Sequence, residues 1–152
     1  MKDKNLRLCT EEDLDAVYGI EIRSFATPWS LESFRSALTA FGTEIWLLTD
    51  HEDNLLGFGC VMTVAGEGEV LNIAVDPAYR RKGYGEILLA ALLQSAEKNG
   101  AEQVFLEVRE SNTPARTLYE KYGFEPIGIR KRYYTNPIED AVCMRCDLQA
   151  RL

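Results

Sequence analysis

The sequence predicts a mixed α/β (α+β) fold in which one central sheet is flanked by helices. Segments with alternating apolar residues and segments with helical spacing follow one another along the 152 residues. Residues 70–108 contain a strand, a helix and a second strand, an order that makes the two strands parallel and their crossover right-handed. Because no repeat, low-complexity tract or linker interrupts the chain, we expect a single domain over residues 1–152.

The first elements expected are a short strand at residues 6–9 and an amphipathic helix. Residues 10–13 resemble a capping box, the pattern that begins many helices, with Asp in place of the usual Glu. Apolar residues then recur at helical spacing as far as Phe25, with Glu21 as a polar exception. A proline ends this helix, and Ser30 is suited to cap a second one.

The middle of the chain predicts three strands and the longest helix. Strands are expected at residues 45–49 and 55–64, and a glycine turn leads into a third strand that ends at Val75. A helix from about Gly85 stops near Gly100, since glycine commonly follows a helix end.

The last third of the chain predicts three further strands and a short helix. A strand is expected at residues 104–108, and the helix begins near Pro114, a residue favoured in the first turn. Two closing strands at residues 124–131 and 141–147 flank a loop at residues 132–137 that is rich in aromatic and turn residues.

Composition excludes several classes of protein. Hydrophobic residues make up 46% of the chain and charged residues 27%, as in ordinary globular proteins. The net charge of -7 argues against direct nucleic-acid binding and suits a basic protein or peptide partner. The start of the chain has no apolar signal, and the longest apolar run, residues 87–93, is too short to span a membrane. We therefore expect a cytoplasmic protein without membrane contact, while the oligomeric state is left open.

A basic glycine turn at residues 80–85 (Arg-Arg-Lys-Gly-Tyr-Gly) is the strongest sign of a ligand site. It lies between an expected strand and an expected helix. Glycines let the backbone approach a ligand closely, and a helix N-terminus adds about half a positive charge. These features favour a phosphate or pyrophosphate, although a solvated basic turn would have the same residues.

Two other glycine motifs do not fit this turn. A Walker A loop requires Lys-Ser or Lys-Thr after its last glycine, and no such pair follows. A dinucleotide-binding fingerprint requires a small residue at position 88, which is Leu88.

Three residues beyond the turn are candidates for chemistry. Ligands of open α/β sheets bind beyond the carboxyl ends of parallel strands, and Glu107 lies near such an end. A strand in the middle of a sheet is normally apolar on both faces, so this carboxylate is unexpected there. Tyr119 lies on an apolar helix face, where core packing is the usual role of a tyrosine, and nothing in the local pattern alone makes it catalytic. Asn112 precedes a helix, where a capping role is the simpler explanation.

The cysteines and the histidine do not predict a metal site. Cys143 and Cys146 are three apart on an expected strand and would point to opposite faces. The chain has one histidine, His51, in a polar turn. We expect reduced, partly buried thiols and no bound metal.

Taken together, these motifs resemble the GNAT family of acetyl-CoA-dependent N-acetyltransferases over essentially the whole chain. The family pattern Arg/Gln-x-x-Gly-x-Gly/Ala is matched by Arg80, Gly83 and Gly85. The resemblance extends to bacterial members that acetylate the N-terminal alanine of a small-subunit ribosomal protein. The segments that match them are residues 72–77, 106–109 with 111–112, 118–120 with 123–124, and 133–134 followed by 139–141.

The resemblance implies a GNAT-like acyl-CoA N-acyltransferase fold, acetyl-CoA as cosubstrate and a protein N-terminus as acceptor. It implies a role for each matching residue. Glu107 would be the general base and Tyr119 the general acid. The cofactor would be bound by Ile73, Ala74, Val75, Arg81, Lys82, Gly83, Tyr84, Gly85, Glu86 and Asn112. Trp29, Tyr133 and Tyr134 would flank the acceptor peptide.

The acceptor and the proton donor can be argued from ordinary pKa values. An α-amino group has a pKa of about 7.7–8.0 and a lysine about 10.4, so an N-terminal acceptor needs about 3 kcal/mol less for deprotonation. Tyr119, at about 10, is a weak acid for a thiolate of about 8.5, so we expect its proton to move as the C–S bond breaks, or its pKa to be lowered locally. Cys60 and Cys143 could serve a covalent route, but neither is expected to adjoin the site, which favours direct transfer in a ternary complex.

Other functions stay open at this stage. The same fold could act on lysine or on a small-molecule amine, because acceptor specificity depends on loops. A non-catalytic acyl-CoA-binding module would keep the basic glycine turn and would not need Glu107 or Tyr119.

Overall fold

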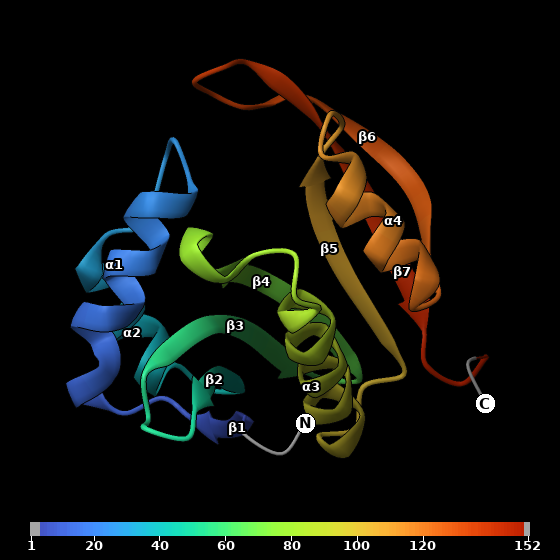
Figure 1. The fold of residues 1–152 in the computed structure, drawn as a ribbon. Coiled ribbons are helices and arrows are strands. Elements are labelled where there is room, and N and C mark those ends of the chain that lie inside the picture. Colours follow the sequence, from blue (N-terminus) through green and yellow to red (C-terminus); the bar gives the residue numbers. More distant parts are fainter. Residues whose placement is uncertain (1–3, 151–152) are drawn as a thin grey trace. The chain divides into compact units, whose positions relative to one another are not determined.

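The computed structural model describes residues 4–150 and confirms the mixed α/β fold (Figure 1). Its seven strands follow the hydrogen-bonded order β1-β2-β3-β4-β5-β7-β6 within the described residues. The strands are β1 (Lys4–Leu8), β2 (Thr43–Asp50), β3 (Leu55–Val64), β4 (Glu67–Val75), β5 (Gln103–Arg109), β6 (Phe124–Tyr134) and β7 (Glu139–Asp147). The helices are α1 (Leu14–Ser24), α2 (Leu31–Thr39), α3 (Tyr84–Lys98) and α4 (Thr113–Lys121).

The chain divides into two compact units. The first contains residues 4–62 and Val70–Ser95, and the second contains Thr63–Glu69 and residues 96–150. Strands β3 and β4 and helix α3 contribute residues to both units.

In the first unit, helices cover both faces of the sheet. Strand β1 pairs with β2, and β2 pairs with β3, in antiparallel register. The alternation of side chains in β2 sends neighbouring residues to opposite faces. Leu47 therefore joins a core with α1 and α2, while Leu48 joins a second core with α3. The first core consists of Cys9, Leu14, Val17, Ile20, Phe34, Ile45, Leu47, Phe58, Cys60 and Ala74.

Two glycines in β3 allow α3 to pack closely on the second face. A Cβ at Gly59 would lie 2.8 Å from a methyl carbon of Leu92. A Cβ at Gly57 would lie 2.8 Å from the carbonyl oxygen of Ala74 and 3.0 Å from Leu88. Side chains at these positions would push the helix that follows the basic glycine turn away from the sheet.

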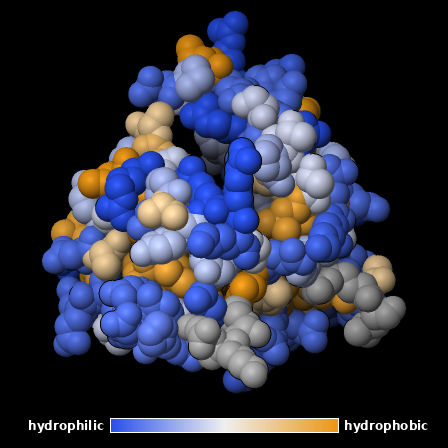
Figure 2. Space-filling model, in the orientation of Figure 1, coloured by the Kyte–Doolittle hydropathy of each residue, from blue (hydrophilic) through white to orange (hydrophobic). Residues whose placement is uncertain are grey.

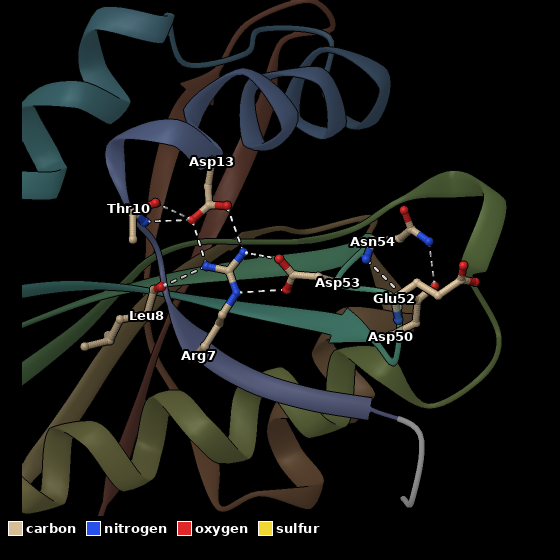
Figure 3. Close-up of polar contacts among 8 residues, drawn as sticks. All are labelled: Arg7, Leu8, Thr10, Asp13, Asp50, Glu52, Asp53 and Asn54. Atoms are coloured by element: carbon tan, nitrogen blue, oxygen red, sulfur yellow. Dashed lines mark hydrogen bonds and ion pairs between the residues drawn. The ribbon is translucent and has the colours of Figure 1, made fainter.

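An arginine connects β1 with the start of α1 and with the turn after β2 (Figure 3). Both terminal nitrogens of Arg7 donate to the Asp13 carboxylate at 2.8 Å, and its Nε donates to Asp53 at 3.0 Å. Asp13 also accepts from the backbone N–H of Thr10 at 2.8 Å, so the predicted capping interaction is present. Arg7 lowers the pKa of Asp13 to about 2.

The second unit is built on strands β5, β6 and β7. Strand β5 pairs with β7 and β7 pairs with β6, both antiparallel, and Glu67–Glu69 of β4 pair with Gln103–Phe105 in parallel. The predicted alternation along β5 is confirmed, because Val104, Leu106 and Val108 are buried while Glu107 is half-buried on the other face.

The predicted loop at residues 132–137 is too long at its start. Strand β6 continues to Tyr134, so Tyr133 and Tyr134 end a strand instead of lying in a loop. Arg132 has a φ of 53°, and its N–H donates to the Asp140 carboxylate at 2.9 Å. This irregularity shifts the register but lets pairing resume at Tyr134, opposite Glu139. Turn-forming residues were therefore compatible with a bulged strand.

The surface drawn in Figure 2 is mostly hydrophilic, with hydrophobic residues scattered over it. Exposed apolar side chains of this kind are normal for a folded protein. Over residues 4–150, the helices are too short or too polar to cross a membrane.

Candidate functional site

The basic glycine turn lies between strand β4 and helix α3, the order that its sequence predicted. Asp76 caps a short 3₁₀ turn at Pro77–Tyr79, accepting from the N–H of Ala78 at 3.1 Å. Arg81 and Gly83 then adopt left-handed conformations, with φ of 65° and 80°. Helix α3 begins directly afterwards, at Tyr84.

The start of helix α3 carries backbone donors that the helix itself cannot satisfy. The first intrahelical bond of α3 runs from the N–H of Ile87 to the carbonyl of Gly83 at 3.3 Å. Helix geometry leaves the N–H groups of Tyr84, Gly85 and Glu86 without intrahelical acceptors. The space that a Cβ at Gly83 would enter is open to at least 4 Å. Open space, donors and the helix dipole together fit an anionic group such as a pyrophosphate.

The charged side chains of the turn have different positions. Arg81 and Lys82 are exposed, where they can attract an anion. The Arg80 Nε donates to the carbonyl of Val75 at 3.2 Å and so ties the turn to the end of β4. Glu86 lies half-buried in the first turn of α3, where the helix dipole favours a carboxylate.

The end of β4 is the segment predicted to pair with the cofactor arm. Ala74 is buried in the core with α1, while Ile73 and Val75 pack against the core with α3. Their side chains thus pack on the two faces of the sheet, with Ile73 and Val75 only partly buried. The backbone role of Ile73, Ala74 and Val75 stays a prediction.

Glu107 lies in a cluster within the second unit. It forms an ion pair with Arg130, and its side chain is 23% exposed. The Cys143 thiol donates to the same carboxylate at 3.8 Å. The expectation that Cys143 does not adjoin the site is therefore wrong. The cause is the strand register, which sets Glu107 directly opposite Cys143.

Three further residues of the second unit surround this carboxylate. Tyr133 hydrogen-bonds to Glu107, and its pKa is raised, mainly by desolvation. Tyr134 stacks against Arg109, with 4.5 Å from the guanidinium carbon to the ring centre, and burial raises its pKa to about 12. Partial desolvation and then the charge of Glu107 raise the pKa of Glu69. The structure therefore places both predicted acceptor-side tyrosines near the predicted base.

Tyr119 is held in the interior by its helix. It is 7% exposed, and its ring centre lies 5.8 Å from that of Phe124. Burial raises the pKa of Tyr119 to about 12. The alternative of a locally lowered pKa is thus contradicted, since desolvation disfavours the charged phenolate.

Asn112 caps helix α4, as the simpler interpretation of its sequence position held. Its side-chain oxygen accepts from the N–H of Ala115 at 3.3 Å. A role of Asn112 toward a cofactor stays a prediction.

In the first unit, Glu21, the polar exception in the apolar pattern of α1, is buried. The Glu21 side chain in α1 is 1% exposed. It accepts from the backbone N–H of Trp29 at 2.9 Å and from the Asn72 side chain at 2.7 Å. Its sequence signal was a single carboxylate within an apolar helical stripe.

The cysteines behave as predicted from the strand pattern. Cys146 is buried and Cys143 half-buried, consistent with opposite faces of β7. Among residues 4–150, no three His, Cys, Asp or Glu side chains gather as metal ligands would.

Comparison with known proteins identifies the class of this protein. Residues 14–124 match the model of the Acetyltransferase (GNAT) family. The chain belongs to the GNAT acetyltransferase family, and it is an acetyl-CoA-dependent N-acetyltransferase.

Named acetyltransferases are similar to this chain in sequence and in structure. The [ribosomal protein bS18]-alanine N-acetyltransferase of Escherichia coli (strain K12) is 40% identical over 134 residues, which cover 87% of this chain and 89% of that protein. The enzyme of the same name from Haemophilus influenzae is 37% identical over 139 residues, covering 90% and 93%. The crystal structure of the Escherichia coli ribosomal-protein-S18-alanine N-acetyltransferase matches with a TM-score of 0.88 and 37% identity, covering 95% and 94%. The structure of Ard1 from Thermoplasma volcanium matches with a TM-score of 0.87 and 25% identity, covering 95% and 97%.

Proposed function

We propose that this protein transfers the acetyl group of acetyl-CoA to the N-terminal α-amino group of a protein, and that the acceptor is the N-terminal alanine of ribosomal protein bS18. The observation that carries the proposal is the 36–40% identity with bacterial enzymes named for that reaction. Such an acceptor places the activity in the cytoplasm, where ribosomes assemble.

Residues of the first unit would bind the cosubstrate. The N–H groups of residues 81–86 would hold the pyrophosphate, and their left-handed turn and helix N-terminus support this role. Backbone groups of Ile73, Ala74 and Val75 would hold the pantetheine arm, and Asn112 of the second unit would add a hydrogen bond. Trp29 would contact the acceptor.

Glu107 would accept the proton that the amine loses on attack at the thioester carbonyl. With an α-amine pKa of about 7.7–8.0, an appreciable fraction of the acceptor is already neutral near pH 7. A single carboxylate, acting directly or through water, is then sufficient help. Tyr133 and Tyr134 lie beside Glu107 and would flank the acceptor N-terminus.

Tyr119 would return a proton to the departing thiolate. Burial gives Tyr119 a pKa of about 12, against about 8.5 for a thiol. Proton transfer from Tyr119 to a thiolate that has already departed would therefore be uphill by about 5 kcal/mol. The proton therefore moves as the C–S bond breaks, so that no free thiolate has to form. Direct transfer leaves an N-acetyl peptide and free coenzyme A, and transfer of the proton from Glu107 to the Tyr119 oxygen, through solvent, returns both groups to their starting states.

A peptide pair tests the proposal. One peptide carries the N-terminus of bS18, beginning with alanine, and contains an internal lysine. The second is identical except for a blocked α-amine. With acetyl-CoA, we expect tandem mass spectrometry to place one acetyl group on the alanine of the first peptide and none on the second. Acetyl on lysine or on a polyamine, with the alanine unmodified, would overturn the acceptor. Coenzyme A binding by calorimetry without turnover on any amine would indicate a non-catalytic module.

A further inference from the structure

Glu21 joins two segments that are far apart in the sequence. Its Oε2 accepts from the backbone N–H of Trp29, and its Oε1 accepts from the side-chain amide of Asn72. Trp29 lies between α1 and α2, and Asn72 lies in β4. One carboxylate therefore connects a helix, an inter-helix segment and a strand of the first unit.

The burial of this carboxylate is costly unless its hydrogen bonds are retained. At 1% exposure it has lost almost all contact with water. Desolvation raises the pKa of Glu21, and the bonds from Trp29 and Asn72 oppose that shift. Both donors are neutral N–H groups with fixed directions, so they specify a position for the carboxylate more strongly than a mobile cation would.

The two connected segments are those assigned to different substrates. Trp29 precedes Ser30, whose hydroxyl caps α2 by accepting from the N–H of Ser33 at 3.0 Å. The Trp29 ring packs 5.1 Å from that of Phe34, so the segment is held at its side chain as well. Asn72 directly precedes Ile73, the first residue of the cofactor-pairing segment.

We propose that Glu21 is a positioning residue that locks the acceptor-side backbone at Trp29 to the cofactor-side strand at Asn72. This inference rests on the proposed function, because it takes Trp29 to contact the acceptor. Removing the hydrogen bonds of Glu21 displaces the segment at Trp29. The affinity for the acceptor therefore falls more than the rate of acetyl transfer from the bound complex.

A donor–acceptor exchange distinguishes this role from general packing. Asn72→Asp sets two carboxylates against each other and removes the donor. Adding Glu21→Gln restores a donor and an acceptor at the same place, because the Gln amide nitrogen can donate to Asp at position 72 while its oxygen accepts from Trp29. Rescue in the double variant requires the specific pair of groups and not merely filled volume.

Steady-state kinetics on the bS18-type peptide supply the first test. We expect Asn72→Asp to raise the KM for the peptide by about tenfold or more, and Glu21→Gln with Asn72→Asp to return it to within about threefold of the wild type. Asn72→Ala, which removes the donor without adding charge, takes the place of Asn72→Asp if that variant does not fold. Glu21→Gln will not rescue it. The exposed Asp15 of α1 gives a matched control as Asp15→Asn.

Hydrogen exchange at the Trp29 amide supplies a test that needs no acceptor. We expect exchange of this N–H to be at least about tenfold faster in the Asn72 single variant and slow again in the double variant. Unchanged exchange, or a double variant no better than the single one, overturns the positioning role. If the wild type acetylates no α-amine, the proposed function fails, and the exchange measurement still decides whether Glu21 locks Trp29 to Asn72.

Discussion

Two carboxylates of this protein, Glu21 and Glu107, interrupt apolar patterns but have opposite surroundings. Glu21 is sealed from water and held by two neutral donors. Glu107 retains contact with water, pairs with Arg130 and lies beside the Cys143 thiol. A sealed carboxylate with fixed donors has no contact with water through which to exchange protons quickly, and it is suited to holding segments together. A carboxylate with water and movable partners can take up and release a proton, as a general base must.

The largest effect is expected for Glu107→Gln. Loss of a general base typically costs 10²–10⁴-fold, so we expect kcat/KM for the peptide to fall about 1,000-fold. The free energy of unfolding should stay within about 0.5 kcal/mol of the wild type, because the site is partly exposed. Initial rates and urea unfolding measure the two quantities.

The exposed Glu125 of β6 provides the control, as Glu125→Gln, which should leave both quantities unchanged. If Glu107→Gln keeps more than a tenth of the activity, Glu107 is not the base. The different surroundings of Glu21 and Glu107 would then not correspond to different functions.

Tyr119→Phe is expected to lower kcat about 100-fold without weakening coenzyme A binding. The ring and its contact with Phe124 remain, so the change removes a hydroxyl and little packing. Turnover is measured with saturating peptide, and affinity by calorimetry with coenzyme A. Tyr18→Phe, on α1, removes a hydroxyl elsewhere and should have no such effect. Equal turnover of Tyr119→Phe and wild type would remove the acid assignment.

The pH dependence of stability should have opposite signs for Glu21 and for Asp13 of the same unit. Burial raises the pKa of Glu21 above 4.5, its value in an unfolded chain. The contribution of Glu21 to the free energy of unfolding is therefore fully present below pH 4.5 and is lost as the pH rises through the pKa of the folded state. Arg7 lowers the pKa of Asp13 from 3.8 to about 2. The Asp13 contribution, about 2 kcal/mol, is therefore present above pH 3.8 and lost as the pH falls towards 2.

Urea unfolding of Glu21→Gln and Asp13→Asn between pH 2.5 and 7 tests these signs. Relative to the wild type, Glu21→Gln should gain stability as the pH rises, and Asp13→Asn should lose it. Parallel curves for the two variants would show that burial does not control the titration of Glu21.

Sequence patterns identified Glu107 but not its surroundings. The five residues 104–108 alone show a carboxylate within an alternating strand pattern, and the burial of alternate residues along β5 confirms that pattern. Cys143 and Arg130 reach Glu107 only through the register of β5, β7 and β6, which depends on pairing between distant segments. Periodicity within one segment contains no information about that register.

Glu21 shows the same limit in a helix. Its polar position was evident, but Asn72 lies 51 residues away and Trp29 donates through its backbone, which no side-chain pattern reveals. The turn-forming residues after Lys131 predicted a loop for Tyr133 and Tyr134, but strand β6 continues to Tyr134. Their role toward the acceptor stays a prediction. Secondary structure and core faces were thus predictable, whereas contacts between elements required the folded chain.

The smallest effect is expected for Cys143→Ala, and it separates direct transfer from a covalent route. The thiol lies 3.8 Å from Glu107, close enough for a carboxylate to draw its proton, so a thioester on Cys143 has to be tested. In direct transfer the thiol only fills space, and Cys143→Ala should keep kcat/KM within about twofold of the wild type, since mutations that touch no reacting group have small effects. Intact mass spectrometry of the wild type with acetyl-CoA and no peptide should show no acetylated protein. A stable adduct that maps to Cys143, together with loss of activity in Cys143→Ala, would make Glu107 the activator of a nucleophile instead of the base for the amine.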